Sequence, residues 1–304
     1  MPPCGITRRA ALAVGGKALA GAALAGPAAA QAGAGVAAID WAMLETALAL
    51  GVVPVAASEL IQFRRYVVEP AVPASVADLG LRGAPNFELL RIVRPDLILL
   101  SNFYEHLGPL YERIAPVFSV TIFQRGKPPY AHAERAARAL GERLERTREA
   151  EGVIEESRRA IGDLRGRLAG AERRPVFVIN LGDARHFRAF GNDSLFGDVL
   201  DRLGFANAWE GASSYSAAAP VGIEALARVP EARVVVVKPI PPEARRVLAT
   251  SALWRALPMV RAGRVAIMEP VNHFGALPAA RRFARLFAAL PESGGRDGGG
   301  LLHD

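Results

Sequence analysis

The stretch "AERAARALGERLERTREAEGVIEESRRAIGDLRGRLAG" (residues 133–170) decides how this chain folds. Its apolar residues recur at helical spacing, and its arginines and glutamates suit pairing at i,i+4. No strand signal appears between residues 131 and 172. The stretch can be read as an ordinary helical hairpin within one domain or as a long connecting helix between two lobes. Its position near the middle of the chain favours the connecting helix.

Short apolar strands alternate with helices on both sides of this segment. Before it, the strand-like stretches are residues 36–40, 52–57, 96–101 and 117–123, and the helical ones are 41–50, 86–93 and 110–116. After it, strands at 176–181, 186–191, 233–239 and 263–269 alternate with helices at 194–204, 252–257 and 277–290. This pattern predicts parallel sheets with crossover connections.

The alternation therefore predicts an α/β fold of two α/β lobes joined by a long connecting helix. We place an N-terminal lobe at residues 33–130, a connecting helical segment at 131–172 and a C-terminal lobe at 173–290. The Gly-rich tail at 291–304 is expected to be disordered. Hydrophobic residues make up 51% of the 304 residues, which is enough for a packed globular core.

The distribution of charge argues against a nucleic-acid partner. The net charge is +7, from 37 Lys and Arg against 30 Asp and Glu. The arginines are scattered through the chain, and no basic block interleaved with aromatic residues appears. A nucleic-acid-binding surface would need such a block, so we expect a solvated basic surface instead.

The first 32 residues read as an export signal. Arg8 and Arg9 precede an Ala/Gly-rich apolar stretch that ends in an Ala-x-Ala motif, as in twin-arginine signals. Cleavage after Ala30 or Ala32 would fit, and the mature protein would then lie in the periplasm. Cleavage would also remove the single cysteine, Cys4, so we expect no disulfide. A disordered Ala-rich tail is the alternative interpretation.

Six stretches carry a more specific resemblance. They are "DWAMLETALALGVVPV" (40–55), "EPAVPASVADLGLRGAPNFELL" (69–90), "RPDLILLS" (94–101), "RIAPVF" (113–118), "FGNDSLFGDVLDRLGFANAW" (190–209) and "LWRALPMVRAGRV" (253–265). Taken in this order, they are similar to the periplasmic ferric-hydroxamate (ferrichrome-type) siderophore-binding protein of an ABC importer. The resemblance runs from about residue 36 to about residue 290, so it covers nearly all of the expected mature chain.

The resemblance implies a binding protein of the class III periplasmic type, in which a rigid helical backbone links two α/β lobes. Such a protein captures a ferric siderophore between its lobes and delivers it to an inner-membrane ABC permease with its ATPase. It acts as a monomer and is not an enzyme. The siderophore satisfies the coordination of the iron, so the protein needs no metal ligands and no bound cofactor. It holds the complex with aromatic faces and a few hydrogen-bond donors.

The resemblance also assigns the ligand-binding residues. Arg82, in a Gly-Leu-Arg-Gly loop between a strand end and a helix start, matches the arginine that donates to the oxygens of the chelating groups. A guanidinium suits this task because it presents fixed, paired donors to negatively charged oxygens. Tyr104 matches a second donor, Tyr66 an aromatic wall position, and Trp209 another pocket aromatic.

Several expected pocket positions depart from the family pattern. Ser216, with Tyr215 beside it, stands where a tryptophan is expected, and so does Asn272, with His273 beside it. Arg188 falls on an apolar wall position. We therefore expect a more polar pocket, and a second arginine would favour a more anionic chelate, such as a carboxylate or mixed-type siderophore.

Members of the family dock on the permease through one acidic residue of each lobe. In the C-terminal lobe, Glu224 fits this role. In the N-terminal lobe, the matching position is Pro109, so Glu105 or Glu112 would have to substitute.

Two other functions remain open. Direct ligation of haem by Tyr104 or His273 would also suit a binding protein of this architecture. A nucleotide-dependent α/β enzyme is less consistent with the sequence, because it has no properly placed phosphate loop, no G-x-S-x-G elbow and no carboxylate pair in a motif. The histidines are too dispersed to indicate a site for a bare metal ion.

Overall fold

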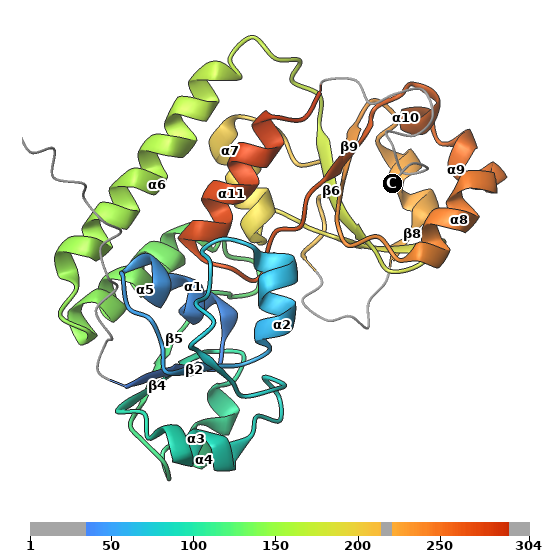
Figure 1. Ribbon diagram of the computed structural model, residues 1–304. Coiled ribbons are helices and arrows are strands. Elements are labelled where there is room, and N and C mark those ends of the chain that lie inside the picture. The colour runs from blue at the N-terminus through green and yellow to red at the C-terminus, as the bar shows by residue number, and fades with distance from the viewer. Residues whose placement is uncertain (1–34, 214–220, 292–304) are drawn as a thin grey trace, which may run out of the picture.

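The computed structural model describes residues 35–213 and 221–291. The expected export signal, nearly all of the expected tail, and the candidate residues Tyr215 and Ser216 lie outside these described residues. Figure 1 shows two lobes, each built around a sheet, with the long helix α6 (Thr147–Arg167) running along one side from the N-terminal lobe to the start of the C-terminal lobe. The predicted two-lobed architecture with a helical connection is thus confirmed.

The N-terminal lobe contains a parallel five-stranded sheet in the order β3-β2-β1-β4-β5. Its strands are β1 (Val36–Ala38), β2 (Ala56–Ala57), β3 (Ala77–Asp78), β4 (Leu97–Ser101) and β5 (Val117–Val120). Its helical elements are α1 (Trp41–Ala49), α2 (Leu60–Gln62) with the π-helical turn η1 (Phe63–Val67), α3 (Phe87–Val93), the 3-10 turn η2 (Glu105–Leu107) and α4 (Gly108–Tyr111). Apolar side chains pack on both faces of this sheet.

Polar caps fix where the helices of this lobe begin. The Asp40 carboxylate accepts hydrogen bonds from the backbone N–H groups of Ala42 and Met43 at the start of α1, at 2.9 and 3.2 Å. The Asn86 side chain accepts one from Leu89 at the start of α3. Each cap satisfies N–H groups that have no partner inside the helix, which sets the helix start.

The connecting segment consists of two helices. Helix α5 (Tyr130–Arg143) ends before Glu145, which adopts a left-handed backbone with φ of 57°, and α6 follows. Two arginine–glutamate pairs join the helices: Arg158 to Glu134 at 2.7 Å and Arg138 to Glu151 at 2.7 Å. The hairpin and the connecting helix are therefore both present, because α6 pairs with α5 and also spans the two lobes.

The C-terminal lobe contains a mixed five-stranded sheet in the order β10-β9-β6-β7-β8. Its strands are β6 (Val176–Leu181), β7 (His186–Ala189), β8 (Val221–Gly222), β9 (Arg233–Val237) and β10 (Val265–Met268). Its helices are α7 (Leu195–Leu203), the 3-10 turn η3 (Ile223–Arg228), α8 (Pro242–Thr250), α9 (Ala252–Ala256), α10 (Pro258–Arg261) and α11 (Leu277–Ala288).

The prediction of parallel strands is wrong for β7, which pairs antiparallel with β6 and with β8, a short strand that the sequence did not predict. The loop between β6 and β7 is too short for a parallel crossover, which needs a dozen or more residues. It closes as a hairpin because the Asp183 carboxylate accepts hydrogen bonds from the backbone N–H groups of Arg185 and His186, at 2.6 and 2.8 Å.

One hydrophobic cluster runs through both lobes. It includes Val36 of the N-terminal sheet, Val178 of the C-terminal sheet, and the rings of Phe196 on α7 and Phe283 on α11, which stack with centroids 4.5 Å apart. In Figure 1, α11 lies between α6 and the rest of the C-terminal lobe, with α1 next to its N-terminal end. The two lobes therefore share one core rather than being joined by a free linker.

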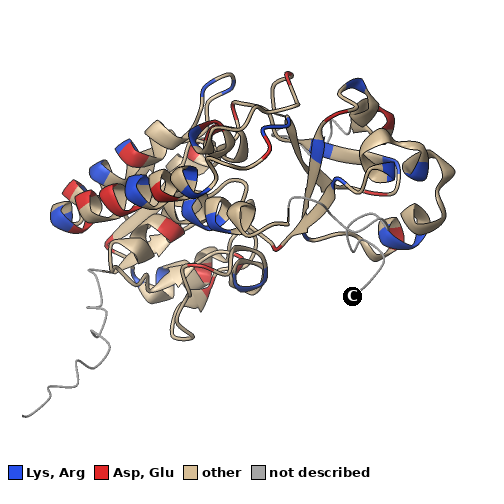
Figure 2. Ribbon diagram, turned by 90° about the horizontal axis from the view of Figure 1, so that it is seen from above, with Lys and Arg blue, Asp and Glu red and all other residues tan. Residues whose placement is uncertain are grey.

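The surface helices carry both signs of charge. Figure 2 shows Lys and Arg interleaved with Asp and Glu along the helices, without a stripe of one sign. None of the helices in the described part of the chain is long and apolar enough to span a membrane.

A pair of glycines tests the contact between α5 and α6. A Cβ atom at Gly141 would lie 2.6 Å from the Cβ of Ala150, whereas at the exposed Gly152 it would meet nothing within 4 Å. We expect Gly141→Ala to lower the free energy of unfolding by about 1–3 kcal/mol through overpacking. Gly152→Ala should raise it by about 0.5–1 kcal/mol, since alanine is the better helix former. Denaturant unfolding measures both, and equal effects would contradict this packing.

Candidate functional site

A cleft of about 640 Å³ lies between the two lobes, at the ends of the sheets where open α/β folds place ligands. This volume lies within the range of about 300–1,000 Å³ that is typical of small-molecule sites. From the N-terminal lobe, the cleft is lined by Trp41, Glu59, Gln62, Tyr66 and Arg82. From the C-terminal lobe, its polar lining residues include Asp183, His186, Arg188, Lys238, Asn272 and His273.

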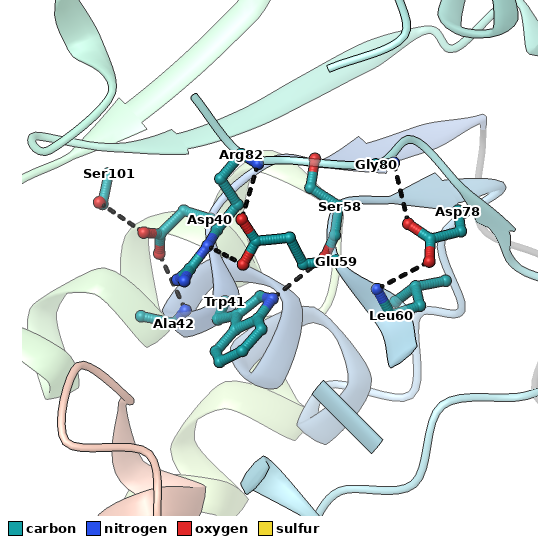
Figure 3. Close-up of polar contacts among 10 residues, drawn as sticks. All are labelled: Asp40, Trp41, Ala42, Ser58, Glu59, Leu60, Asp78, Gly80, Arg82 and Ser101. Carbon is teal, nitrogen blue, oxygen red and sulfur yellow. Dashed lines mark hydrogen bonds and ion pairs between the residues drawn. The ribbon is translucent and has the colours of Figure 1, made fainter. Parts of the chain in front are cut away.

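Arg82 is held in place by Glu59 (Figure 3). The Arg82 Nε–H donates to one Glu59 carboxylate oxygen at 2.8 Å, and the Arg82 backbone N–H donates to the other at 3.0 Å. The guanidinium also lies over the ring of Trp41, 4.0 Å from its centroid. Its Nη groups make no hydrogen bond to any described residue, so they remain available as donors in the cleft.

A buried polar framework supports this arginine (Figure 3). The Trp41 indole N–H donates to the backbone carbonyl of Ser58 at 3.0 Å, which fixes the ring beneath the guanidinium. Asp40, which caps α1, also accepts a hydrogen bond from the Ser101 hydroxyl at 2.9 Å. Burial raises the pKa of Asp40, while that hydrogen bond and the nearby Arg82 charge oppose the shift.

Tyr66 reaches the cleft from the π-helical turn η1. This turn directly follows α2, which lies on the side of the N-terminal lobe that faces the C-terminal lobe (Figure 1). Two non-glycine residues with positive φ bracket α2 and η1: Glu59 at 54° and Val68 at 68°. Such conformations are costly for residues other than glycine, and they cluster at functional sites. Here, one of them places the Glu59 carboxylate against Arg82.

Arg188 provides a second guanidinium on the opposite wall. Burial alternates along strand β7: His186 and Arg188 are partly exposed where they line the cleft, whereas Phe187 and Ala189 are buried. The half-buried Arg188 donates from Nη1 to Nε2 of His273 at 2.8 Å.

His273 is a neutral acceptor in this arrangement. Burial, followed by the charges of Arg188 and Arg82, lowers the pKa of His273 to about 3. Its ring packs against Phe190 and Phe274, with centroids 5.4 and 4.2 Å away. Because Nε2 already accepts from Arg188, His273 is poorly placed to ligate haem iron.

Asn272, which lines the cleft, is tied to the N-terminal lobe. Its side-chain amide donates to the Glu45 carboxylate of α1 at 2.6 Å. The other Glu45 oxygen accepts from the backbone N–H of Ala276 at 3.0 Å. Burial raises the pKa of Glu45 to about 8. This fully buried carboxyl group joins α1 to the segment that leads into α11.

Comparison with known proteins places this architecture in a family. The model of a family described as "Periplasmic binding protein" matches residues 36–271. The chain belongs to the periplasmic binding protein family. It is 33% identical over 251 residues to the iron(3+)-hydroxamate-binding protein FhuD of Escherichia coli (strain K12), covering 83% of this chain and 84% of that protein.

Two further similar proteins are informative. The Fe(3+)-citrate-binding protein YfmC of Bacillus subtilis (strain 168) is 24% identical over 241 residues, covering 76% of this chain and 71% of that protein. The crystal structure of FhuD from Vibrio cholerae with Fe3+-Desferal bound superposes with a TM-score of 0.78 at 28% identity, covering 83% of this chain and 96% of that one.

The other candidate residues lie away from the cleft lining. Tyr104 packs against the N-terminal core near Arg82; burial raises the pKa of its phenol and the Arg82 charge opposes the shift. Trp209 packs edge-on against Phe187, with centroids 6.3 Å apart, on the C-terminal core. Glu105, Glu112 and Glu224 are all exposed.

The sequence reasoning missed several residues that shape the site. Nothing in the sequence indicated that Glu59 would pair with Arg82. Trp41 was also not singled out, although it stands in one of the stretches that carry the resemblance. It also missed three rings that meet between the lobes, Phe103, Phe123 and Phe274, whose centroids lie 5.3–5.7 Å apart. Within the described ranges, no group of three or more His, Cys, Asp or Glu could hold a metal ion.

The raised pKa of Glu45 predicts a pH dependence of stability. A carboxyl group that ionises at about 8 when folded, but at about 4.5 when unfolded, stabilises the fold below pH 4.5 and loses that contribution as the pH rises to 8. Glu45→Gln keeps the shape and cannot ionise. Between pH 4.5 and 8, the free energy of unfolding of Glu45→Gln relative to that of the wild type should therefore increase by up to about 1.4 kcal/mol for each unit that the pH rises. Urea unfolding measures both proteins across this pH range. If the difference in their free energies of unfolding does not change with pH, Glu45 is not neutral in the folded protein.

Proposed function

We propose that this chain is an extracytoplasmic solute-binding protein that captures a hydroxamate-containing ferric siderophore in the cleft between its lobes. It delivers this cargo to an inner-membrane ABC permease and its ATPase. The family membership, the 33% identity to an iron(3+)-hydroxamate-binding protein and the likeness to a Desferal-bound structure support this proposal.

The observation that carries the proposal is the placement of Arg82. Its guanidinium faces the cleft with its Nη groups free of described partners, and Glu59 and Trp41 fix its orientation. A hydroxamate chelate presents a shell of negatively charged oxygens around iron, and a preorganised guanidinium donates to such oxygens with little loss of side-chain entropy. The iron is cargo whose coordination the siderophore supplies.

The rest of the proposed biology follows from this role. The protein binds and releases its ligand without covalent chemistry, so it is not an enzyme, and it acts as a monomer. We place it in the periplasm after removal of a twin-arginine signal, with cleavage after Ala30 or Ala32.

Titration of intrinsic tryptophan fluorescence with ferric and iron-free siderophores tests the proposal. Trp41 lines the cleft beside Arg82, so its emission should change when a ligand binds. At least one ferric hydroxamate should bind with a Kd below about 10 μM, and its iron-free form more weakly. If no ferric siderophore of the panel binds this tightly, the proposed function is wrong.

Removal of Arg82 tests its role in binding. Arg82→Ala should weaken binding of the ferric hydroxamate by at least about 1.5 kcal/mol, the low end for a hydrogen bond to a charged group. The control is Arg91→Ala, which removes an exposed arginine of α3 away from the cleft. Isothermal titration calorimetry measures both, and an unchanged affinity in Arg82→Ala would remove this residue from the site.

We propose that Glu224, with Glu105 or Glu112 on the other lobe, docks the protein on arginines of the permease. Glu224→Arg should then reduce uptake of radioactive ferric siderophore by cells about tenfold or more, because it places like charges together at the interface. Ligand affinity should not change. Glu243→Arg, a matched reversal on the exposed face of α8, should leave uptake unchanged. Equal uptake in the two variants would contradict docking through Glu224.

A further inference from the structure

Arg188 differs from the other cationic side chains of the cleft in its partner. Its Nη1 group donates to the neutral ring of His273, and it forms no ion pair with any described carboxylate. By contrast, Arg82 is paired with Glu59 at 2.8 Å, and Lys238 with Glu269 at 2.7 Å. Among the described residues, the positive charge of Arg188 therefore has no counterion on the cleft wall.

The position of Arg188 makes that charge costly. The side chain is half-buried, and burial lowers the pKa of its guanidinium without an opposing effect from any described carboxylate. Burying a charge without an opposite charge is unfavourable, and a hydrogen bond to a neutral imidazole offsets only part of the cost. An anionic group of the ligand would offset the rest.

The partner of Arg188 also orients it. The Nε2 atom of His273 accepts a hydrogen bond from Nη1 of Arg188, so this edge of the Arg188 guanidinium faces the segment before α11. The other N–H groups of Arg188 have no hydrogen-bond partner among the described residues. Because the pKa of His273 is lowered to about 3, the ring remains an acceptor at every pH at which the protein would work. Arg188 is thus a fixed donor on the wall opposite Arg82, which lies on the other lobe.

A ferric trihydroxamate does not itself supply the missing charge. Three singly charged hydroxamates cancel the charge of Fe³⁺, so the chelate as a whole is neutral. Arg82 and Glu59 form a neutral pair and so match a neutral chelate. An anion for Arg188 must be a further group of the ligand, outside the coordination of the iron.

We propose that Arg188, oriented by His273, forms a second subsite of the cleft that binds a free carboxylate of the siderophore. This inference rests on the proposed function and narrows its ligand to ferric hydroxamate siderophores that carry a carboxylate not bound to iron. It assigns the two arginines different tasks: Arg82 binds the chelate, and Arg188 selects the charge of the group beside it.

Three ferric complexes of one hydroxamate scaffold test this subsite. Desferrioxamine B ends in an amine and gives a cationic complex; acetylation of that amine gives a neutral complex, and succinylation gives an anionic one with a free carboxylate. The wild-type protein should bind the succinylated complex about tenfold or more tighter than the acetylated one, as expected for a hydrogen bond between charged groups. The amine-terminated complex should bind most weakly.

Substitutions of Arg188 test whether this residue causes the preference for the succinylated complex. In Arg188→Gln, the affinity ratio of the succinylated to the acetylated complex should fall to about one, while Arg188→Lys, which keeps the charge, should retain part of it. The matched control is Arg185→Gln, which removes an exposed arginine just before the same strand, outside the cleft lining. This control should keep the full ratio.

The outcomes separate this inference from the proposed function. If the acetylated complex binds and the wild-type protein shows no preference for the succinylated one, the carboxylate subsite is wrong while the proposed function stands. A preference that persists in Arg188→Gln also overturns the subsite. If none of the three ferric complexes binds, and no other ferric siderophore does, the proposed function itself fails.

Discussion

A single hydrophobic core shared by both lobes is the constraint on which the cleft depends. Side chains from both sheets and from α1, α6, α7 and α11 join one cluster, so the lobes cannot separate without exposing it to water. The buried Glu45 carboxyl group adds a polar tie between α1 and the segment before α11. The walls of the cleft are therefore held in position before a ligand arrives, which lowers the cost of binding.

The shared core holds Arg82 and Arg188 on opposite walls of one cleft, and the two arginines differ in the charge of their partners. Arg82 is neutralised and oriented by Glu59, so it offers hydrogen-bond donors without adding net charge. Arg188 has a neutral partner in His273, so it adds both donors and charge. Under the proposed function, Arg82 would bind a neutral metal chelate through its oxygens, and Arg188 would discriminate among such chelates by the charge of their remaining groups.

The sequence predicted those parts of the fold that depend on local chemistry. Helix α7 begins and ends where expected, because Ser194 caps it and Gly204, with φ of 84°, adopts the left-handed backbone that ends it. Strand β10 (Val265–Met268) also lies within the stretch 263–269 that was predicted to be a strand. The α2–η1 segment was missed, because a short helix between residues with positive φ has no periodic pattern to detect.

The residues of the site were predictable only in part, because a side chain's direction depends on tertiary contacts. The resemblance singled out Arg82, Tyr66, Arg188, Asn272 and His273, and all five line the cleft. Tyr104 and Trp209 pack on their own lobes instead. Glu59 lies 23 residues from Arg82 in the chain, and the pairing of β2 with β3 brings the two segments together.

A crystal structure of the protein with a ferric trihydroxamate tests the central claim most directly, because it shows which atoms face the chelate. We predict that the chelate lies between the lobes, with its iron-bound oxygens within hydrogen-bond distance of the Arg82 Nη groups and Glu59 still paired with Arg82 Nε. A chelate bound outside the cleft, or one in the cleft that leaves Arg82 without contact, would contradict this account.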